Sequence, residues 1–417
     1  MGQTITEKIL ADKCGKKIVK AGEFIEPQPD IILANDVTAP SAIKEFKKLG
    51  VPKVFNKDKI VFVMDHFATG AAESAEQLKI VREFAKEQDI FHYYEGGNAG
   101  IAHILLPQQH IVLPGFAAIG ADSHTCAYGA VGAFSTGIGA ADAAAAMAEG
   151  KLWMKVPQSI RFILKGTKNK WVSGKDIILY IIGEIGVDGA LYASMEFEGP
   201  ICKELSMSER LTICNMTVEA GAKNGIFAPD SITKKYIPRS KKYKIYSSDK
   251  NADYYQTYEI DCSKIYPQVS LPYSPANTRN VKTLKKIFID QVVIGSCANG
   301  SIEDLRIAAQ IIKKGKKINP NVRMIIIPST PKIYAAALKE GLIEIFTSAG
   351  ASVSEPFCGV CLGNSMGALA SGEKCLATTS RNFVGRMGHP KSEVYLSSPA
   401  TAAASAIKGY ISEADEI

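Results

Sequence analysis

The sequence has no long hydrophobic run, and none of its segments approaches the roughly 18 apolar residues that a membrane-spanning helix needs. Its first residues, MGQTITEKILADKCGKK, also lack the apolar stretch of a secretory signal, and their amphipathic pattern predicts a first helix instead. We therefore expect a cytoplasmic protein with no membrane partner. Neither sign of charge dominates, because the net charge is only +7 over 417 residues. This small excess does not by itself indicate nucleic-acid binding.

Cysteine and histidine are sparse, with nine and six residues respectively. The cysteines are odd in number and scattered, unlike a disulfide framework, so we expect them to stay thiols in a reducing compartment. With 46% hydrophobic and 22% charged residues, the composition is that of an ordinary globular protein. At 417 residues the chain exceeds the roughly 250 to 300 residues that one core holds, so we expect two or three domains. We find no internal repeat and no low-complexity tract.

Four apolar, β-rich runs end in small or polar residues, and helical patterns alternate with them; the runs are residues 59–66, 110–125, 291–297 and 322–330. This alternation predicts an α/β protein with parallel sheets. Ligand sites in such sheets lie at the carboxyl ends of the strands. Three of the runs end in reactive residue types, namely Asp65-His66, Asp122-Ser123-His124 and Cys297. We therefore expect these side chains to line one crevice.

The composition changes between residues 232 and 275, where Lys, Tyr and Ser are abundant and a helical pattern is weak. We interpret this segment as exposed strands and a linker between domains. Its basic and aromatic residues could also bind single-stranded nucleic acid through charge and stacking. The segment matches no recognisable nucleic-acid module, so a solvated connector is the favoured interpretation.

Cys358 and Cys361, in PFCGVCLGN, are separated by two residues, and a metal site would need further ligands besides them. The natural third is Cys297, which ends a buried run just before a helix predicted to begin at Ser301, with Asp304 completing a capping pattern. Three thiols are one short of a structural zinc site or a four-thiolate electron carrier. A [4Fe-4S] cluster with one iron free of protein ligands fits the count, and that iron would be a Lewis acid. On spacing alone, inert buried cysteines, zinc and a redox pair stay as alternatives.

The chain resembles the large subunits of the aconitase superfamily, and most closely those of the isopropylmalate dehydratase branch. The resemblance runs along nearly the whole chain and rests on motifs that follow the family's order: MDH, GIAH, GADSHT, ICNMTVEAGAKNGIF, GSCANG, CGVCLG and SRNFVGR. It implies a three-domain α/β/α large subunit with an iron–sulfur cluster in the cleft between domains. We place the domains at residues 1–157, 158–280 and 281–417, the last of which carries the cluster cysteines.

The resemblance also implies roles for individual residues. The cluster ligands would be Cys297, Cys358 and Cys361. The acid–base groups around the open iron would be histidines paired with carboxylates, which fix the tautomer of an imidazole and raise its basicity; these are Asp65, His66, His103, Asp122, His124 and Glu219. The substrate would be held by amide, hydroxyl and guanidinium groups, the latter suited to carboxylates; these are Asn35, Ser123, Asn215, Arg381 and Arg386. Asn215 and Glu219 are four residues apart, so we expect them on one face of a helix.

Each of these residues also has an ordinary interpretation. His66 and His124 could be core histidines at strand ends, Arg381 and Arg386 could be surface charges, and Asn215 with Glu219 could be a solvated stripe. The concurrence of three histidines beside acidic residues in family motifs favours the catalytic interpretation. Four positions depart from the usual pattern without removing a ligand or an acid–base group, and they bear on the substrate rather than on the chemistry: Ala127, Ala298, Phe357 and Ser380.

The implied reaction is a dehydration and rehydration that moves a hydroxyl group between adjacent carbons of a malate-type acid. In the family, the base that removes the carbon-bound proton is a serine of a separate swivelling domain, which heterodimeric members carry on a small subunit. We therefore expect a small-subunit partner, in a heterodimer or heterotetramer, and an alkylmalate substrate. Homocitrate, citraconate and dimethylmalate are alternative substrates. A non-catalytic RNA-binding cluster protein and a structural zinc protein are further alternatives.

Overall fold

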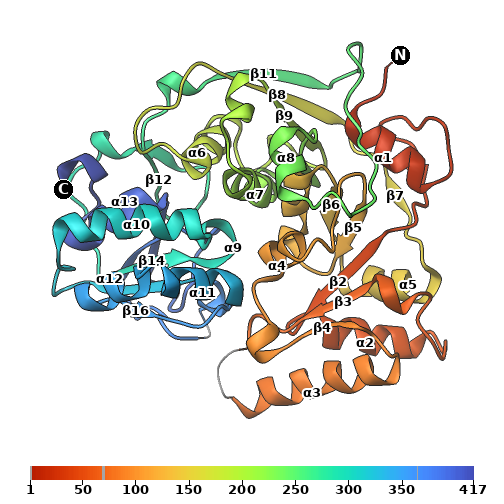
Figure 1. The fold of residues 1–417 in the computed structure, drawn as a ribbon, viewed down its shortest axis with the longest axis horizontal. Helices are drawn as coiled ribbons and strands as arrows, with labels where there is room; N and C mark the ends of the chain where they lie inside the picture. The colour runs from red at the N-terminus through yellow and green to blue at the C-terminus, as the bar shows by residue number, and fades with distance from the viewer. Residues whose placement is uncertain (1, 68–70, 364) are drawn as a thin grey trace.

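The computed structural model describes residues 2–67, 71–363 and 365–417. Three sheets, each with its own helices, form three units that meet in the middle of the molecule (Figure 1). The first unit runs from red to yellow, the second from yellow to green and the third from cyan to blue, and the C-terminus lies on the third unit, away from the N-terminus. Over the described residues, every helix is too short or too polar to cross a membrane.

The first sheet has five strands in the order β4-β3-β2-β5-β6, and all neighbours are parallel. Its strands are β2 (Ile31–Asn35), β3 (Ile60–Val63), β4 (His92–Tyr94), β5 (Ala117–Gly120) and β6 (Phe134–Gly137). The helices of this unit are α1 (Ile5–Lys13), α2 (Ala39–Lys48), α3 (Ala72–Glu87), α4 (Ala102–Gln108) and α5 (Ala140–Glu149), and a short ribbon joins β1 (Phe24–Ile25) to β7 (Met154–Lys155). The expected alternation of strands and helices, and the expected N-terminal helix, are confirmed.

Alternate residues of the first sheet enter two different cores, as the period of a strand requires. Ile32 and Phe62 pack with α2, α3 and α5, whereas Leu33 and Val61 face a larger core that continues into the other two units. Both faces of the sheet are therefore covered. A ligand can reach this unit only at a rim of the sheet, and polar residues gather at the carboxyl rim.

The second sheet has four parallel strands in the order β10-β9-β8-β11. They are β8 (Ser159–Lys165), β9 (Ser194–Glu198), β10 (Asn224–Phe227) and β11 (Gln256–Asp261). The helices are α6 (Gly174–Ile185), α7 (Met207–Met216) and α8 (Ser231–Tyr236), and the 3-10 turn η5 (Thr217–Ala220) follows α7. Phe162 stacks between Phe197 and Tyr258, with ring centroids 5.4 Å and 5.1 Å away. Aromatic stacking thus holds three of these strands together.

The third sheet has seven strands in the order β13-β12-β18-β17-β14-β15-β16. Its strands are β12 (Gln268–Ser270), β13 (Thr278–Asn280), β14 (Gln291–Gly295), β15 (Arg323–Ile327), β16 (Ser352–Val353), β17 (Lys374–Ala377) and β18 (Glu393–Ser397). Its helices are α9 (Ser296–Asn299), α10 (Ile302–Gly315), α11 (Pro331–Lys339), α12 (Leu342–Ala349) and α13 (Pro399–Lys408). The capping pattern expected at Ser301 and Asp304 begins α10, so that prediction is confirmed.

The domain limits expected from the sequence stay predictions. The limit at 157/158 falls between β7 and β8. β12 and β13 pair with the third sheet through β18, in antiparallel register, although they precede residue 281. We therefore propose that the third unit begins just before Gln268.

The Lys- and Tyr-rich segment 232–275 contains both helical and strand structure. Its first residues belong to α8, which the weak helical pattern did not predict. Residues 256–261 form β11, an edge strand of the second sheet that is largely exposed, as expected for this segment. The segment therefore closes the second sheet and leads into the third.

A contact between two glycines joins the first unit to the second. The 3-10 helix η3 (Ser123–Val131) lies against β10, and a Cβ atom on Gly129 would stand 1.6 Å from the carbonyl oxygen of Gly225. No side chain can occupy that space, so the two backbones pack directly. Since η3 carries His124 and β10 follows the turn that carries Glu219, this contact sets how closely those two elements approach.

We expect Gly129→Ala to lower the free energy of unfolding by about 1–3 kcal/mol, because the added methyl group must push the two backbones apart. Thermal unfolding monitored by circular dichroism would measure the change. Gly97→Ala is the matched control, since a Cβ atom there meets nothing within 4 Å. Equal melting temperatures for the two variants would contradict the tight packing of η3 on β10.

Candidate active site

The site begins where the strand order of the first sheet reverses, between β2 and β5. Such a point leaves a crevice outside the carboxyl ends of the strands. Asn35 ends β2 and Asp122 follows β5, and the Nδ2 group of Asn35 donates to Oδ2 of Asp122 at 2.8 Å. The Oδ1 atom of Asn35 accepts from the Val37 and Thr38 amides and from the Thr38 hydroxyl. These contacts fix the amide so that its nitrogen faces the carboxylate.

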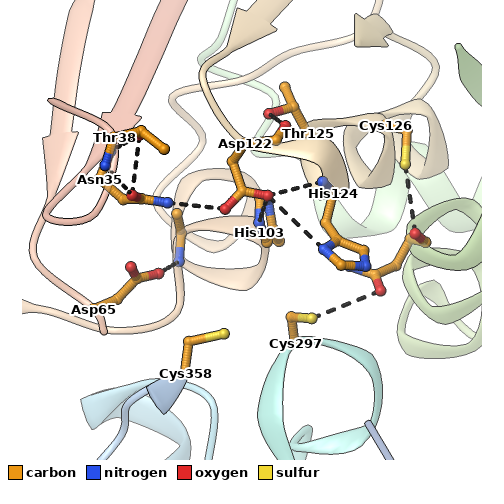
Figure 2. Close-up of polar contacts among 12 residues, drawn as sticks. Asn35, Thr38, Asp65, His103, Asp122, His124, Thr125, Cys126, Cys297 and Cys358 are labelled. Carbon is orange, nitrogen blue, oxygen red and sulfur yellow. Dashed lines mark hydrogen bonds and ion pairs between the residues drawn. The ribbon is translucent and has the colours of Figure 1, made fainter. Parts of the chain in front are cut away.

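Asp122 is the centre of a network, with Asn35 on one side and His103 and His124 on the other (Figure 2). Its Oδ1 atom accepts from the backbone amide of His124 at 2.8 Å and lies 3.1 Å from Nε2 of His103. Burial raises the pKa of Asp122, but His103, His124 and His66 outweigh burial and hold the pKa well below its usual value. The carboxylate is therefore ionised and shared among its donors.

His103 lies on the first turn of α4, where Asp65 supports the helix by accepting from the Ala102 amide at 2.8 Å. Burial lowers the pKa of His103, but Asp122 reverses the effect and raises it above the usual value. Asp122 occupies its Nε2, and its Nδ1 is buried without a partner among the described residues. The imidazolium form of His103 is thus favoured, and its Nδ1 remains available to a further acceptor.

His66 follows β3 and lies between two carboxylates. Its Nδ1 atom is 2.7 Å from Oδ1 of Asp65 and 3.2 Å from Oδ1 of Asp36. Burial lowers the pKa of His66, yet the two carboxylates together raise it well above its ordinary value, whereas burial raises the pKa of Asp65. The imidazolium form of His66 is therefore favoured.

Asp36 is a site residue that the sequence interpretation missed. It is 0% exposed and accepts from the backbone amides of His66 and Phe67 in addition to facing the His66 ring. A signal for it was present, because Asp36 directly follows Asn35 at the end of a fully buried strand. A carboxylate in that position must find buried donors.

His124 pairs with a carboxylate from the second unit. Its Nε2 atom lies 3.1 Å from Oε1 of Glu219, and the same oxygen accepts from Nε of Arg381 at 2.7 Å. Burial raises the pKa of Glu219, but the hydrogen bond from His124 and the charge of Arg381 bring it below its usual value. The expectation that Glu219 shares a helix with Asn215 is wrong, because α7 ends at Met216 and Glu219 lies on η5.

Ser123 begins η3 and lines, with Asp122, a cavity of about 550 Å³ that extends between the first and second units. Trp153, Tyr192 and Lys223 lie along the same cavity. The hydroxyl of Ser123 is therefore placed where a small molecule could reach it from solvent.

Cys297 comes from the third unit and sits on the short helix α9 rather than at the end of a strand, as the sequence had indicated. The two residues before it have unusual backbones, with φ of +139° at Gly295 and +66° at Ser296. A residue with a side chain is strained at such an angle, and strain of this kind gathers at functional sites. The Sγ atom of Cys297 is 3.6 Å from Oδ1 of Asn215, which also accepts from the Ser380 hydroxyl at 2.8 Å.

Cys358 precedes the 3-10 turn η8 (Gly359–Leu362), and Cys361 lies within it. The backbone amide of Cys358 donates to the carbonyl of Asp65 at 2.6 Å, which ties this loop to the first unit. Cys358 packs with Cys297 and Ile101 in a small buried cluster. A hydrogen bond between the two thiols lowers the pKa of Cys297 well below its usual value and raises that of Cys358 well above it. Arg386 donates to the sulfur of Cys361 at 3.4 Å.

The spacing of these sulfurs does not suit one zinc ion. Among the described residues, ligand atoms from three side chains lie within 4.8 Å of one another in two places, His103/Asp122/His124 and Asp36/Asp65/His66, and the three cysteines form no such trio. Zinc holds thiolates at about 2.3 Å, so two sulfurs on one ion are at most about 4.6 Å apart. As they lie in the structure, the three thiols are therefore not arranged around one zinc ion.

Unsatisfied nitrogen atoms surround the cysteines. Asn215 Nδ2, His103 Nδ1 and Arg386 Nε are all buried and have no hydrogen-bond partner among the described residues. Leaving one buried donor unpaired costs about 1–3 kcal/mol, so three together indicate an acceptor that binds there. Two of the donors are charged, which favours an anionic acceptor.

The other cysteines do not join this group. Cys126 donates to the backbone carbonyl of Asn215 at 3.5 Å, and burial raises the pKa of its thiol to about 12. Burial likewise raises the pKa of Cys202 and Cys375 to about 12. Burial thus favours the protonated form of these three thiols.

Comparison with known proteins places these features in a family. The model of the aconitase family (aconitate hydratase) matches residues 7–409. A 3-isopropylmalate dehydratase large subunit of Endomicrobium trichonymphae is 66% identical, and another from Thermodesulfovibrio yellowstonii is 59% identical; each similarity covers 100% of both chains. Among solved structures, aconitase X of Thermococcus kodakaraensis shares the fold, with a TM-score of 0.50, 12% identity and coverage of 90% of this chain and 89% of that chain.

We expect Asp122→Asn to lower the pKa of His103, because Asp122 is the strongest of the charges that oppose the effect of burial. The raised pKa of His103 stabilises the native fold below about pH 6.5, and this contribution disappears as the pH rises through the folded pKa. The lowered pKa of Asp122 stabilises the fold above about pH 3.9, and this disappears as the pH falls through its folded pKa. NMR titration of the histidine rings in the metal-free chain would follow His103, assigned with His103→Gln.

The control for this titration is His92, whose pKa burial lowers and which has no contact with Asp122. Its titration curve should be the same in both proteins. If His103 titrated alike with and without the Asp122 carboxylate, the ion pair would have no bearing on its charge.

Proposed function

The chain belongs to the aconitase family, and from that premise we propose that it is the cluster-bearing large subunit of a 3-isopropylmalate dehydratase. In this role it interconverts 2-isopropylmalate and 3-isopropylmalate in leucine biosynthesis. The observation that carries the proposal is a set of three buried nitrogens near the three thiols that have no hydrogen-bond partner within residues 2–67, 71–363 and 365–417, next to histidines paired with carboxylates. Full-length similarity to proteins of that name supports the choice of substrate.

The donor set fits an iron–sulfur cluster. Cys297, Cys358 and Cys361 would hold one [4Fe-4S] cluster per chain, which when bound supplies a Lewis acid at the iron that has no cysteine ligand. The side chains of Asn215 and Arg386 would donate to its sulfur atoms, because both already contact a cysteine sulfur and both have a further donor to spare.

Arginine and amide side chains would hold the substrate. Arg381 uses its Nε for Glu219, so its terminal nitrogens are left to face a carboxylate. Arg386 approaches from the other end of the same loop and would take the second carboxylate, as the guanidinium fork allows. Asn35 and Ser123 would donate hydrogen bonds at the rim of the first sheet, and Ser123 also lines the cavity of about 550 Å³.

The proton for the departing hydroxyl would come from Nε2 of His66. Two carboxylates face its Nδ1, so this nitrogen keeps its proton and the ring stays an imidazolium that can release the other. His103 with Asp122 and His124 with Glu219 would keep the developing charges in place. The base that removes the proton from the adjacent carbon would come from the small subunit, in a heterodimer or heterotetramer.

The proposal is tested by reconstituting the cluster in the purified chain without oxygen and assaying hydration of isopropylmaleate. We expect no turnover from the chain alone and full turnover after the cognate small subunit is added. Citraconate, dimethylmaleate and homoaconitate serve as substrate controls, and we expect isopropylmaleate to be preferred. Turnover without any added protein, or preference for another acid, would contradict the proposal.

We expect serine at position 297, 358 or 361 to abolish the visible absorbance of the reconstituted cluster and to reduce turnover by more than a thousandfold, since an alcohol does not replace a thiolate ligand. Iron and sulfide analysis would accompany the spectra. Cys202→Ala is the matched control, because Cys202 is also buried but lies in the core of the second unit. Cluster loss in the control, or an intact cluster in two of the three serine variants, would argue against these ligands.

A further inference from the structure

Lys175 is a lysine that is buried completely and that the proposed mechanism does not use. It is 0% exposed and lies on the first turn of α6, in the second unit. Its Nζ atom donates to the backbone carbonyls of Thr378 at 2.9 Å and Thr379 at 2.6 Å, both in the third unit. Among the described residues, no carboxylate lies within ion-pair distance of this ammonium group.

The position is costly for a cation. Removing an ammonium ion from water costs several kcal/mol, and carbonyl dipoles recover only part of that. The N-terminal turn of a helix is also where a positive charge is least favoured. Burial lowers the pKa of Lys175 to about 8, and the charges of Cys297 and Asp176 act in the opposite direction, so the group is still cationic near pH 7. The negative charges that act on it come from Cys297, Asp176, Asp304 and Cys361, so the thiolates of the proposed cluster ligands supply part of its charge balance.

The two carbonyls that Lys175 holds belong to a turn that leads into the site. Thr378 is bound to the strand before Cys297, because its hydroxyl accepts from the Gly295 amide at 2.9 Å. The next residues along the chain are Ser380, which donates to Asn215, and Arg381, which donates to Glu219. The ammonium group therefore connects the second unit to the cysteine-bearing and the arginine-bearing parts of the third.

We propose that Lys175 is a positioning residue of this site: its ammonium group fixes the turn 378–381 that carries Ser380 and Arg381, and its charge balances the negative charge of the thiolate-bound cluster. The second half of this inference rests on the proposed function, since it needs the cluster. Both parts follow from a buried cation that donates to backbone carbonyls alone and lies close enough to Cys297 for the two charges to interact.

The test uses three substitutions at one position. Lys175→Met removes the charge and the donors, Lys175→Gln keeps donors without charge, and Lys175→Arg keeps both. A cavity of about 310 Å³ beside Lys175 can accept the larger guanidinium group. Lys168→Met is the matched control, because Lys168 lines the same cavity but pairs with Glu209 and does not touch the turn. Each variant is reconstituted with cluster, and its iron content and melting temperature are recorded first.

The decisive measurement is the reduction potential of the cluster, followed by EPR without substrate or small subunit. We expect a shift to more negative potential in the Met and Gln variants, because reduction adds negative charge that Lys175 no longer offsets. The Arg and Lys168→Met proteins should keep the wild-type potential. With the small subunit present, KM for isopropylmalate should rise about tenfold in the Met variant and less in the Gln variant, whose amide can still hold the turn.

An unchanged potential in folded, cluster-loaded Met and Gln variants would overturn the electrostatic part, and an unchanged KM would overturn the positioning part. If Lys175→Met does not fold, the comparison of Lys175→Gln with Lys175→Arg tests both parts by the same two measurements. Failure of all three variants to fold would make Lys175 a requirement of the fold and refute the proposal. Because the potential is measured without substrate, it decides about Lys175 even if isopropylmalate proves to be the wrong acid.

Discussion

The carboxylate of Asp122, whose side chain is only 13% exposed, is the group on which the rest of the proposed site depends. An ionised carboxylate in a protein interior must find donors, and Asp122 finds them in Asn35, His103 and the backbone of His124. These hydrogen bonds to Asp122 bring the end of β2, the start of α4 and the start of η3 close together. The electrostatic consequence is reciprocal, since the same contacts keep His103 charged and lower the pKa of Asp122.

The remaining groups reach this centre from the other units. The second unit supplies Asn215 and Glu219 on consecutive turns, and the third supplies the three cysteines and the arginine loop. Hydrogen bonds also join the units within the proposed site. The Cys358 amide donates to the Asp65 carbonyl, and Arg381 donates to Glu219. The proposed site is therefore formed by all three units together, with histidine–carboxylate pairs from the first and second units and thiols from the third.

The sequence was most informative where local pattern and chemistry coincide. Strand ends carrying Asp65, Asp122 and their histidines follow from alternation alone, because parallel strands must present their carboxyl ends at one rim. Features that depend on distant contacts escaped it. Packing between the units determines that α7 ends before Glu219 and that Cys297 lies on a helix. The sequence around Lys175 likewise does not predict that its ammonium group binds carbonyls about 200 residues further along the chain. Asp36 lay within reach, but an aspartate beside an asparagine at a strand end is also an ordinary turn signal.

The largest hydrophobic core runs without a break from one face of the first sheet through the second unit into the third. Sliding one unit past another would open that core to water, so hinge motion inside this chain is expensive. The walls that the three units form around the proposed site should therefore have the same shape before and after a substrate binds. Any movement that admits a substrate is therefore expected outside this shared core, at the rim of the sheets.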